Sequence, residues 1–317
     1  MTQDERCLVG RLNILVALSF SILLFLASSL LAGTCDCDIS PSQVATFNSL
    51  LNLTPAQQAE AIHTHLPWGT PVNPPTATHE HLLYQQDYIL DYDDDLRVPI
   101  WAAYKLTAQE VEARRKRTQC FRNDPRLLDA SSAFCADYDE PIFDRGHLVP
   151  NADMTRSESA MINTYMFSNM TPQYANFNRG IWNRLEGYVR KWAEARGEIY
   201  VISGTVFDRD HDGHRDPDDQ AELVSPTHRV AIPTAFYKII LYKNPDGGIE
   251  SMAFLLPHDN HKHIGKEAAQ YLNKHLTSIG NIESITGLEF LPRMRKGDSS
   301  DKTALETGMA TAFWAKH

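Results

Sequence analysis

The architecture of this chain follows from the hexapeptide Phe143-Asp144-Arg145-Gly146-His147-Leu148. Two further blocks follow it, first Ser168-Asn169-Met170-Thr171-Pro172-Gln173 and then Asn178-Arg179-Gly180-Ile181-Trp182-Asn183-Arg184-Leu185-Glu186. Together they place a histidine beside a cation and a carboxylate, and add two amides and a second carboxylate further along. Side chains of these types suit acid–base chemistry on an anionic substrate.

Each of these side chains has a property that cleavage of a phosphodiester requires. The imidazole of His147 titrates near neutrality and can take a proton from water. A single amide oxygen, such as that of Asn178, suits magnesium, which keeps most of its waters and needs few protein ligands. Arg145 can hold a phosphate in bidentate fashion. The set therefore predicts phosphodiester hydrolysis.

The three blocks resemble the DNA/RNA non-specific endonucleases, the sugar-non-specific branch of the ββα-metal (His-Me finger) nucleases. Asp-Arg-Gly-His is the signature of that family, and the other two blocks match it in order and spacing. The similarity spans roughly residues 82–291. It implies an α+β protein, a ββα-metal nuclease fold with a central antiparallel sheet and flanking helices. It also implies cleavage of DNA and RNA with Mg²⁺ (or Mn²⁺).

The resemblance assigns a role to each matching residue. His147 matches the general base that activates the attacking water, and Asn178 matches the one direct protein ligand of the magnesium ion. Glu186 matches the carboxylate that holds the waters of the metal. Asn169 matches an amide that supports the site.

The family also implies roles for charged residues around the phosphate. Arg145 matches the signature arginine near the scissile phosphate, and Asp144 matches a positioning carboxylate. A further arginine upstream usually stabilises the phosphorane-like transition state. Residues 114–117 and 121–124 offer several candidates, of which we favour Arg122, in its Phe-Arg-x-Asp context, with Arg117 second.

Several of these residues have a structural explanation as well. Asn169 and Asn178 also suit turn and N-cap positions, and for Asn178 capping and metal binding are compatible. The basic run 114–117 suits a solvated face as well as a phosphate track. Trp182 and Trp192 lie on an apolar helical stripe and are predicted to be core residues.

Charge and missing motifs exclude other classes. The net charge of −10 argues against a protein that coats nucleic acid by bulk charge. The chain has no His-Glu-x-x-His, no Gly-x-Ser-x-Gly, no phosphate loop with Gly-Lys-Ser/Thr and no Gly-x-Gly-x-x-Gly after a strand. Metalloproteases, α/β-hydrolases, ATPases and dinucleotide enzymes therefore lack their signatures.

Residues 1–34 are predicted to be a signal peptide or an N-terminal membrane anchor. Arg6 and Arg11 precede an apolar run, 14–33, that ends in small residues as secretory signals do. The run of about 20 residues is also long enough to span a bilayer uncleaved. Either alternative predicts a secreted or periplasmic protein. Residues 35–80 are expected to form a helical N-terminal segment with a Pro-rich linker, and 81–317 the nuclease domain.

Four cysteines follow the targeting segment: Cys35, Cys37, Cys120 and Cys135. An even number in an exported chain predicts disulfides, and neither pair has the spacing of a zinc finger. We expect a bridge between Cys120 and Cys135, which would close a loop of about 15 residues. Cys35 and Cys37 receive no assignment.

The remaining pattern predicts an irregular mixture of strands and helices. Helices are expected after Pro41 and after the capping box at Thr54. Strands are expected at 84–92, 97–106, 198–207, 229–242 and 251–256, and further helices at 156–167, 178–195 and 264–279. Because this order shows no βαβ alternation, it supports an α+β fold.

Residues 208–219 carry acids at positions 1, 3, 5, 9 and 12 and glycine at position 6. That is the spacing of an EF-hand loop, with aspartate in place of the usual glutamate at the twelfth position. We expect Asp208, Asp210, Asp212, the backbone carbonyl of His214 and Asp219 to hold a structural Ca²⁺. The alternative is a mobile acidic loop.

Three functions remain open at this point. The first is a magnesium nuclease that binds DNA and RNA through the phosphate backbone, with no sequence-specific site. The second is a calcium-stabilised extracellular binding module on the same fold, and the third is a phosphodiesterase for small nucleotides. The presence of both His147 and Asn178 favours the nuclease, since a copy without catalysis would be expected to lose one of them.

Overall fold

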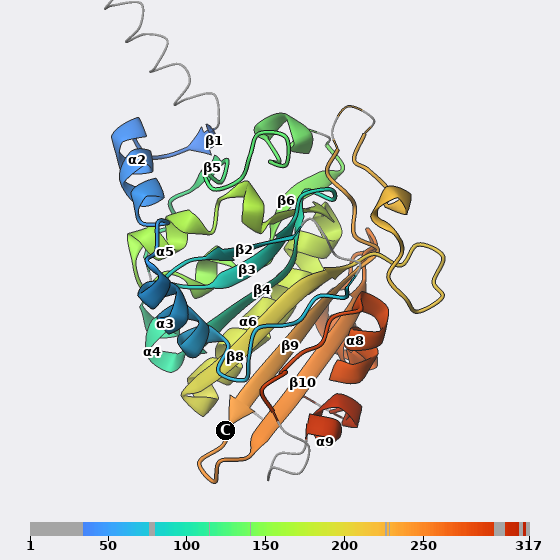
Figure 1. The fold of residues 1–317 in the computed structure, drawn as a ribbon. Coiled ribbons are helices and arrows are strands. Elements are labelled where there is room, and N and C mark those ends of the chain that lie inside the picture. The colour runs from blue at the N-terminus through green and yellow to red at the C-terminus, as the bar shows by residue number, and fades with distance from the viewer. Residues whose placement is uncertain are drawn as a thin grey trace, which may run out of the picture.

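A seven-stranded antiparallel sheet forms the middle of the molecule (Figure 1). The computed structural model describes residues 34–75, 80–113, 115–139, 141–225, 227, 229–294, 302–310 and 313–314. The strand order is β11-β10-β9-β8-β4-β3-β2. The bounds are Glu80–Tyr84 for β2, Ile89–Asp93 for β3, Val98–Thr107 for β4, Glu198–Val206 for β8, Ala235–Lys243 for β9, Ile249–Pro257 for β10 and Leu276–Thr277 for β11. The α+β class predicted from the sequence is confirmed.

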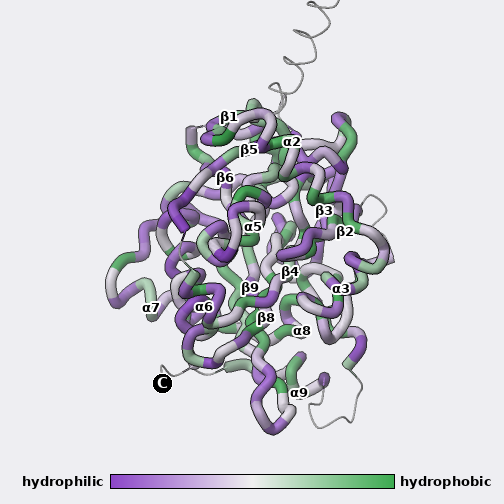
Figure 2. Tube along the Cα trace, turned by 90° about the vertical axis from the view of Figure 1, so that its left-hand side faces the viewer, coloured by the Kyte–Doolittle hydropathy of each residue, from purple (hydrophilic) through white to green (hydrophobic). Residues whose placement is uncertain are grey.

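Helices pack on both faces of this sheet, so its central strands are buried on two sides. Alternate residues of β9 belong to two different hydrophobic clusters, with Tyr237 and Ile239 on one face and Phe236 and Ile240 on the other. On the second face lies α6 (Asn183–Arg196), and on the first lie α3 (Pro55–His65) and α8 (Ile279–Thr286). Figure 2 shows the hydrophobic strands β8 and β9 inside and hydrophilic residues on the outer loops.

The expected N-terminal helices are present. α2 (Pro41–Ser49) and α3 each begin with proline after a capping box, made by Ser40 with Gln43 and by Thr54 with Gln57. In each box the hydroxyl accepts from a backbone N–H that the helix itself leaves unpaired. No helix in the described part of the chain is long and apolar enough to cross a membrane. The predicted targeting segment lies outside the described residues, apart from Thr34.

Several element boundaries differ from the prediction. The strand expected at 84–92 is a hairpin of β2 and β3, in which the N–H of Gln85 donates to the carbonyl of Tyr88 at 3.0 Å. The strand expected at 229–242 begins only at Ala235. The helix expected at 156–167 shrinks to α5 (Glu158–Asn163), and that at 264–279 gives α7 (Gly265–Lys274) followed by β11 and α8. Tight turns, and prolines near the ends of elements, interrupt segments that look continuous when only the hydrophobic periodicity of the sequence is considered.

The expected bridge between Cys120 and Cys135 is wrong. The structure pairs Cys35 with Cys135 and Cys37 with Cys120, across 100 and 83 residues of sequence. The strand β1 (Thr34–Cys37) lies antiparallel to β5 (Cys120–Arg122), and this register sets Cys37 opposite Cys120. Spacing along the chain favoured the short loop, whereas the pairing of two distant strands decides the outcome.

The hairpin of β6 (Phe143–His147) and β7 (Met170–Tyr174), whose strands are joined by residues 148–169, lies outside the central sheet. β6 pairs antiparallel with β7, which puts His147 opposite Met170 and Asp144 opposite Gln173. The helical segment η4 (Phe177–Trp182) and then α6 follow β7 directly. Two strands and a helix in this order form the ββα unit that the sequence signature implied.

Peptide mapping of the non-reduced protein tests the disulfide pattern. We expect peptides joined through Cys35–Cys135 and Cys37–Cys120. Replacing Cys37 and Cys120 together with serine should lower the free energy of unfolding by about 2–5 kcal/mol, the usual effect of losing a native disulfide. A peptide joined through Cys120 and Cys135 would contradict the pairing.

Candidate active site

The first and third sequence blocks meet at one cleft of about 320 Å³. Of the seven residues predicted for catalysis and magnesium binding, four line this cleft: Arg145, His147, Asn178 and Glu186. The full lining consists of Arg117, Phe121, Arg145, His147, Pro150, Asn151, Ala152, Asn178, Arg179, Asn183 and Glu186. The cleft therefore lies between the β6–β7 hairpin, the start of α6 and the loop before β5.

His147 ends strand β6, two residues after Arg145, so both side chains leave the same face of the strand. Its ring lies edge-on to Tyr165 at 4.9 Å between centroids. No group in the described ranges hydrogen-bonds to its Nε2. Burial, together with the smaller effect of the positive charge of Arg117, lowers the pKa of His147 to about 3. A hydrogen bond with the backbone of Arg145 acts in the opposite direction and raises the pKa. The imidazole is therefore neutral at pH 7, the form that accepts a proton.

The carboxylate of Asp144 joins the strand of His147 to the segment of Asn178. Arg179 donates to it from Nε at 2.8 Å and from Nη2 at 2.5 Å, and the Nδ2 of Asn178 donates at 3.0 Å. Because the amide nitrogen of Asn178 is committed to Asp144, its oxygen is the atom left to face a cation. Asp144 thus occupies the position of an orienting carboxylate.

The segment that carries Asn178 is a π-helix rather than the first turn of a regular α-helix. The N–H of Asn183 donates to the carbonyl of Asn178, five residues earlier. Single π-turns of this kind are frequent at functional sites. Asn178 and Glu186 are eight residues apart, and the wider π-turn changes the angle between them around the helix axis from that of a regular α-helix. Asn178, Asn183 and Glu186 all line the cleft.

Glu186 lies at the floor of the cleft beside charges that the sequence did not point to. Only 9% of Glu186 is exposed, and burial raises its pKa to about 7 against the attraction of Lys238. Lys238 on β9 is fully buried, donates to the hydroxyl of Ser203, and lies 4.3 Å from the ring centre of Trp182. Burial lowers its pKa to about 8. A lysine at an inward position of an apolar strand is the signal that sequence reasoning overlooked.

A second buried acid lies beside Glu186 without lining the cleft. Asp153 is fully buried, accepts from the hydroxyl of Tyr104 at 2.7 Å and pairs with Arg190 at 2.8 Å. Asp153 and Glu186 together face Lys238 and Arg190, so two negative groups are balanced by two positive ones. Such balance is needed because an unpaired buried charge is strongly destabilising.

Asn169 supports the chain around His147 rather than the substrate. It is fully buried, and its Nδ2 donates to the carbonyls of Val149 and Thr164 at 3.0 and 2.9 Å. Its Oδ1 accepts from the N–H of Val149 at 3.0 Å. With every amide position engaged, Asn169 fixes the loop that leaves His147, which agrees with a supporting amide.

The structure places the favoured arginine, Arg122, away from the cleft. Its guanidinium is buried and donates to Asn48, to the carbonyl of Ile162 and to Asn163, at 2.9, 2.8 and 2.7 Å. Neighbouring strand residues point to opposite sides, and it is Phe121 that lines the cleft. Arg117, the second candidate, does line it, whereas Arg114 lies outside the described residues.

Gln173 ends the second sequence block, and the sequence alone gave it no role. It is fully buried opposite Asp144, and neither of its amide atoms has a partner in the described part of the chain. A Cβ on Gly146 would lie 2.2 Å from its Cδ. The glycine of the signature is therefore required by the close approach of Gln173.

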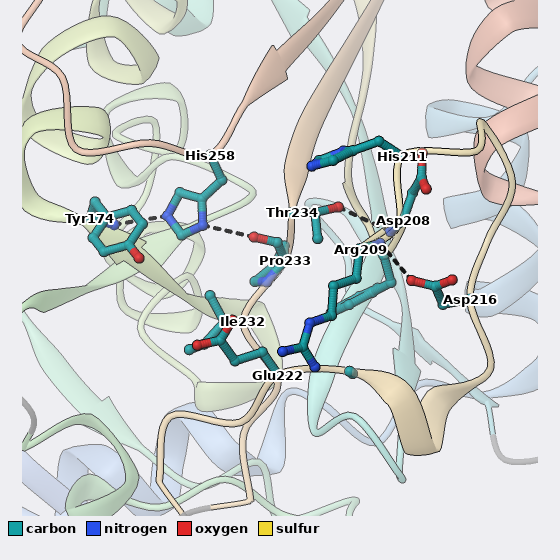
Figure 3. Close-up of a pocket in the computed structure, with 12 residues that line it drawn as sticks. Tyr174, Asp208, Arg209, His211, Asp216, Glu222, Ile232, Pro233, Thr234 and His258 are labelled. Carbon is teal, nitrogen blue, oxygen red and sulfur yellow. Dashed lines mark hydrogen bonds between the residues drawn. The ribbon is translucent and has the colours of Figure 1, made fainter.

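A separate pocket of about 250 Å³ lies where β7 ends, beside the acidic loop (Figure 3). His258 in this pocket forms two hydrogen bonds. The N–H of Tyr174 donates to the Nε2 of His258 at 2.9 Å, so the Nδ1 of His258 carries the proton and donates to the carbonyl of Pro233 at 2.8 Å. Burial lowers the pKa of His258 to about 4. His258 thus ties the hairpin to the central sheet and is structural.

The acidic loop brings together part of the predicted calcium set. Carboxylate oxygens of Asp208, Asp210 and Asp212 all lie within 4.8 Å of one another. The side chain of Asp219 is not part of this group, and the ligand expected from His214 is its backbone carbonyl rather than its ring. The N–H groups of Asp212 and Gly213 donate to Asp208 at 3.1 and 3.2 Å, so local hydrogen bonds also explain the arrangement. Calcium binding stays a prediction.

Thermal unfolding with added calcium tests it. A site with the near-millimolar affinity of extracellular modules would stabilise the fold by about 1.4 kcal/mol at ten times its Kd. We expect the melting temperature to rise by a few degrees in wild type and in the control Asp246→Ala, but not in Asp210→Ala/Asp212→Ala. An unchanged melting temperature in the wild type would remove calcium from the account.

Comparison with known proteins agrees with the geometry of the cleft. Residues 70–296 match the DNA/RNA non-specific endonuclease family. The chain is 32% identical to the mitochondrial nuclease EXOG of Danio rerio over 71% of this chain and 64% of that protein. It is 30% identical to the mitochondrial endonuclease G of Homo sapiens, covering 66% of this chain and 69% of that one.

A third relative, the venom phosphodiesterase of Naja atra, is 27% identical over 83% of this chain and 34% of its own length. The chain thus spans about two thirds of the two mitochondrial nucleases and about a third of the venom protein. The family match covers the hairpin, η4 and α6, with every residue of the cleft. This chain belongs to the DNA/RNA non-specific endonuclease family.

Proposed function

We propose that this protein is a metal-dependent endonuclease that hydrolyses the phosphodiester bonds of DNA and RNA without sequence preference. One observation carries the proposal. The lining of one cleft holds a neutral imidazole whose Nε2 has no partner among the described residues, the amide of Asn178 with only its nitrogen bound to Asp144, and the arginines Arg117 and Arg145. These are the base, the cation ligand and the phosphate-binding groups that the reaction needs.

His147 acts as the general base in this proposal. In the protein without substrate, Arg117 contributes to the low pKa of the imidazole. A phosphate held by Arg117 and Arg145 brings negative charge next to the ring and offsets that effect. The pKa of His147 therefore rises towards neutrality when substrate binds, where a base works best.

The residues present fit a magnesium (or manganese) ion. Asn178 offers its Oδ1 because Asp144 holds its Nδ2, and Glu186 offers a carboxylate that can hold the waters of the ion. A bound divalent cation neutralises charge on the phosphate and on the leaving oxygen. Asp144 and Arg179 keep Asn178 in place, and Lys238 and Arg190 favour the charged form of Glu186.

A basic groove beside the cleft favours a polymer over a small nucleotide. The groove, of about 550 Å³, shares Arg117, Asn151 and Ala152 with the cleft and adds Arg115, Arg190 and Lys191 to its lining. Arg115, Arg117 and Lys191 are exposed. Several cations beyond the site of cleavage suit further phosphates of a strand. Contacts to phosphates position a nucleic acid without reading its sequence.

We also propose that the protein works outside the cytosol, secreted or periplasmic. Two disulfides at the N-terminal end of the described chain support an oxidising compartment. The apolar run in residues 14–33 supports export, by cleavage or with a retained anchor.

Replacing the base tests the chemistry. His147→Ala should lower the rate of plasmid cleavage by about 10²–10⁴-fold, the usual contribution of a general base. Affinity for DNA should survive, because the arginines remain. The measurement is single-turnover cleavage in magnesium, with binding followed by fluorescence anisotropy.

His261→Ala is the matched control, since His261 is an exposed histidine outside the cleft. It should cleave like the wild type. Near-normal cleavage by His147→Ala would refute the assignment of the base.

Reversing charges in the groove tests the polymer substrate. Arg115→Glu/Lys191→Glu should raise the KM for plasmid DNA. It should also flatten the dependence of binding on salt, by about 0.9 in the slope of log K for each phosphate that the protein no longer neutralises. Hydrolysis of a dinucleotide should not change.

The control for charge is Lys243→Glu, at the exposed end of β9. An equal effect of the control and the groove variant, or an equal loss on the dinucleotide, would remove the groove from the substrate path.

A further inference from the structure

The guanidinium of Arg145, which the proposed function gives to the substrate phosphate, is bound to a carboxylate of the chain itself. Its Nη1 lies 2.6 Å from the Oδ2 of Asp36. Its Cζ lies 4.8 Å from the centre of the Phe121 ring, which also lines the cleft. The N-terminal strand thus reaches the phosphate-binding side of the cleft.

Asp36 owes its position to an irregularity in strand β1. Cys35 pairs with Phe121 and Cys37 with Cys120, so Asp36 is an extra residue between two consecutive pairs. Its φ is +47°, a left-handed conformation that is uncommon for residues other than glycine. Bulges of this kind redirect a side chain, and uncommon backbone conformations persist where the surroundings determine them. The bulge directs Asp36 to Arg145.

Covalent bonds hold the bulge on both sides. Cys35 is bonded to Cys135 and Cys37 to Cys120, so the residues before and after Asp36 are both anchored. Figures 1 and 2 place β1 and β5 together at the end of the molecule where β6 lies. The segment is therefore fixed beside the cleft, although 109 residues separate Asp36 from Arg145 in sequence.

We propose that Asp36 competes with the substrate phosphate for Arg145 and so limits the affinity of the cleft for nucleic acid. This inference rests on the proposed function, since it takes the ligand of Arg145 to be a phosphate. A carboxylate and a phosphate bind a guanidinium through the same charge-assisted hydrogen bonds. A phosphate that approaches Arg145 must displace Asp36 or share the guanidinium with a second negative charge.

The ion pair between Asp36 and Arg145 is exposed on the side of Asp36, so a phosphate can displace the carboxylate. The side chain of Asp36 is 60% exposed, against 18% for Arg145. The carboxylate can return to water without being left unpaired in the interior, so releasing it costs little. The guanidinium of Arg145, by contrast, is also packed on the ring of Phe121, a contact that does not involve Asp36.

The test is binding of a short DNA duplex to the full chain carrying His147→Ala, in which cleavage of the probe should be slowed about 10²–10⁴-fold. Adding Asp36→Asn keeps the size of the side chain and removes its charge. We expect the Kd for the duplex to fall about twofold to fivefold, the range in which exposed ion pairs act. Asp38→Asn is the matched control, because Asp38 is exposed two residues away, bonds to the Gln119 backbone and carries the same charge.

A double-mutant cycle ties the effect to Arg145. In a protein that carries Arg145→Ala, adding Asp36→Asn should no longer change the Kd. Equal effects of Asp36→Asn and Asp38→Asn would overturn the proposal, since general charge would then explain the gain. Weaker binding by Asp36→Asn would also overturn it and would make Asp36 a residue that orients Arg145.

The outcome is separable from that of the proposed function. If the wild type fails to cleave nucleic acid but Asp36→Asn tightens binding through Arg145, the endonuclease proposal fails and the competition stands. If the wild type cleaves and Asp36→Asn leaves binding unchanged, the competition fails and the endonuclease stands.

Discussion

The carboxylate of Asp144 is the group on which the cleft depends, because it joins two elements that approach each other only in the folded chain. It leaves the strand that ends at His147 and meets Arg179 and Asn178 in the helical segment that leads to Glu186. Arg179 is 74% exposed, and an ion pair so exposed adds at most about 1 kcal/mol to stability. The value of the ion pair is therefore orientation: it decides which atom of the Asn178 amide faces the cleft.

Elsewhere in the cleft, burial and neighbouring charges determine the protonation states of His147 and Glu186. His147 is held neutral by burial and by Arg117. Glu186 is buried, which disfavours its charged form, and the buried Lys238 opposes that effect. Buried charged groups are tolerated at the floor of the cleft because each acidic side chain is paired with a basic one. Removing one partner would leave a buried charge uncompensated.

The fold and most of the cleft could be predicted because the signature places its residues by short-range geometry. A strand ending at His147 and a helix beginning near Asn178 follow from a few residues each. Strand alternation around Phe121 could have excluded Arg122, had the strand been recognised, whereas Arg117 lies before that strand. The disulfides could not, because the pairing of Cys37 with Cys120 depends on two strands 83 residues apart. The same holds for Asp36, whose partner Arg145 lies 109 residues away in sequence and meets it only through a bulge.

The decisive experiment is cleavage of supercoiled plasmid and of single-stranded RNA by the purified protein, in magnesium and then in excess EDTA. If hairpin and helix assemble a metal-dependent site that binds only the phosphate backbone, both substrates are degraded in magnesium, at positions without a shared sequence, and neither is degraded in EDTA. Undiminished cleavage in EDTA, or no cleavage of either polymer in magnesium, would refute a metal-dependent nuclease site in this cleft.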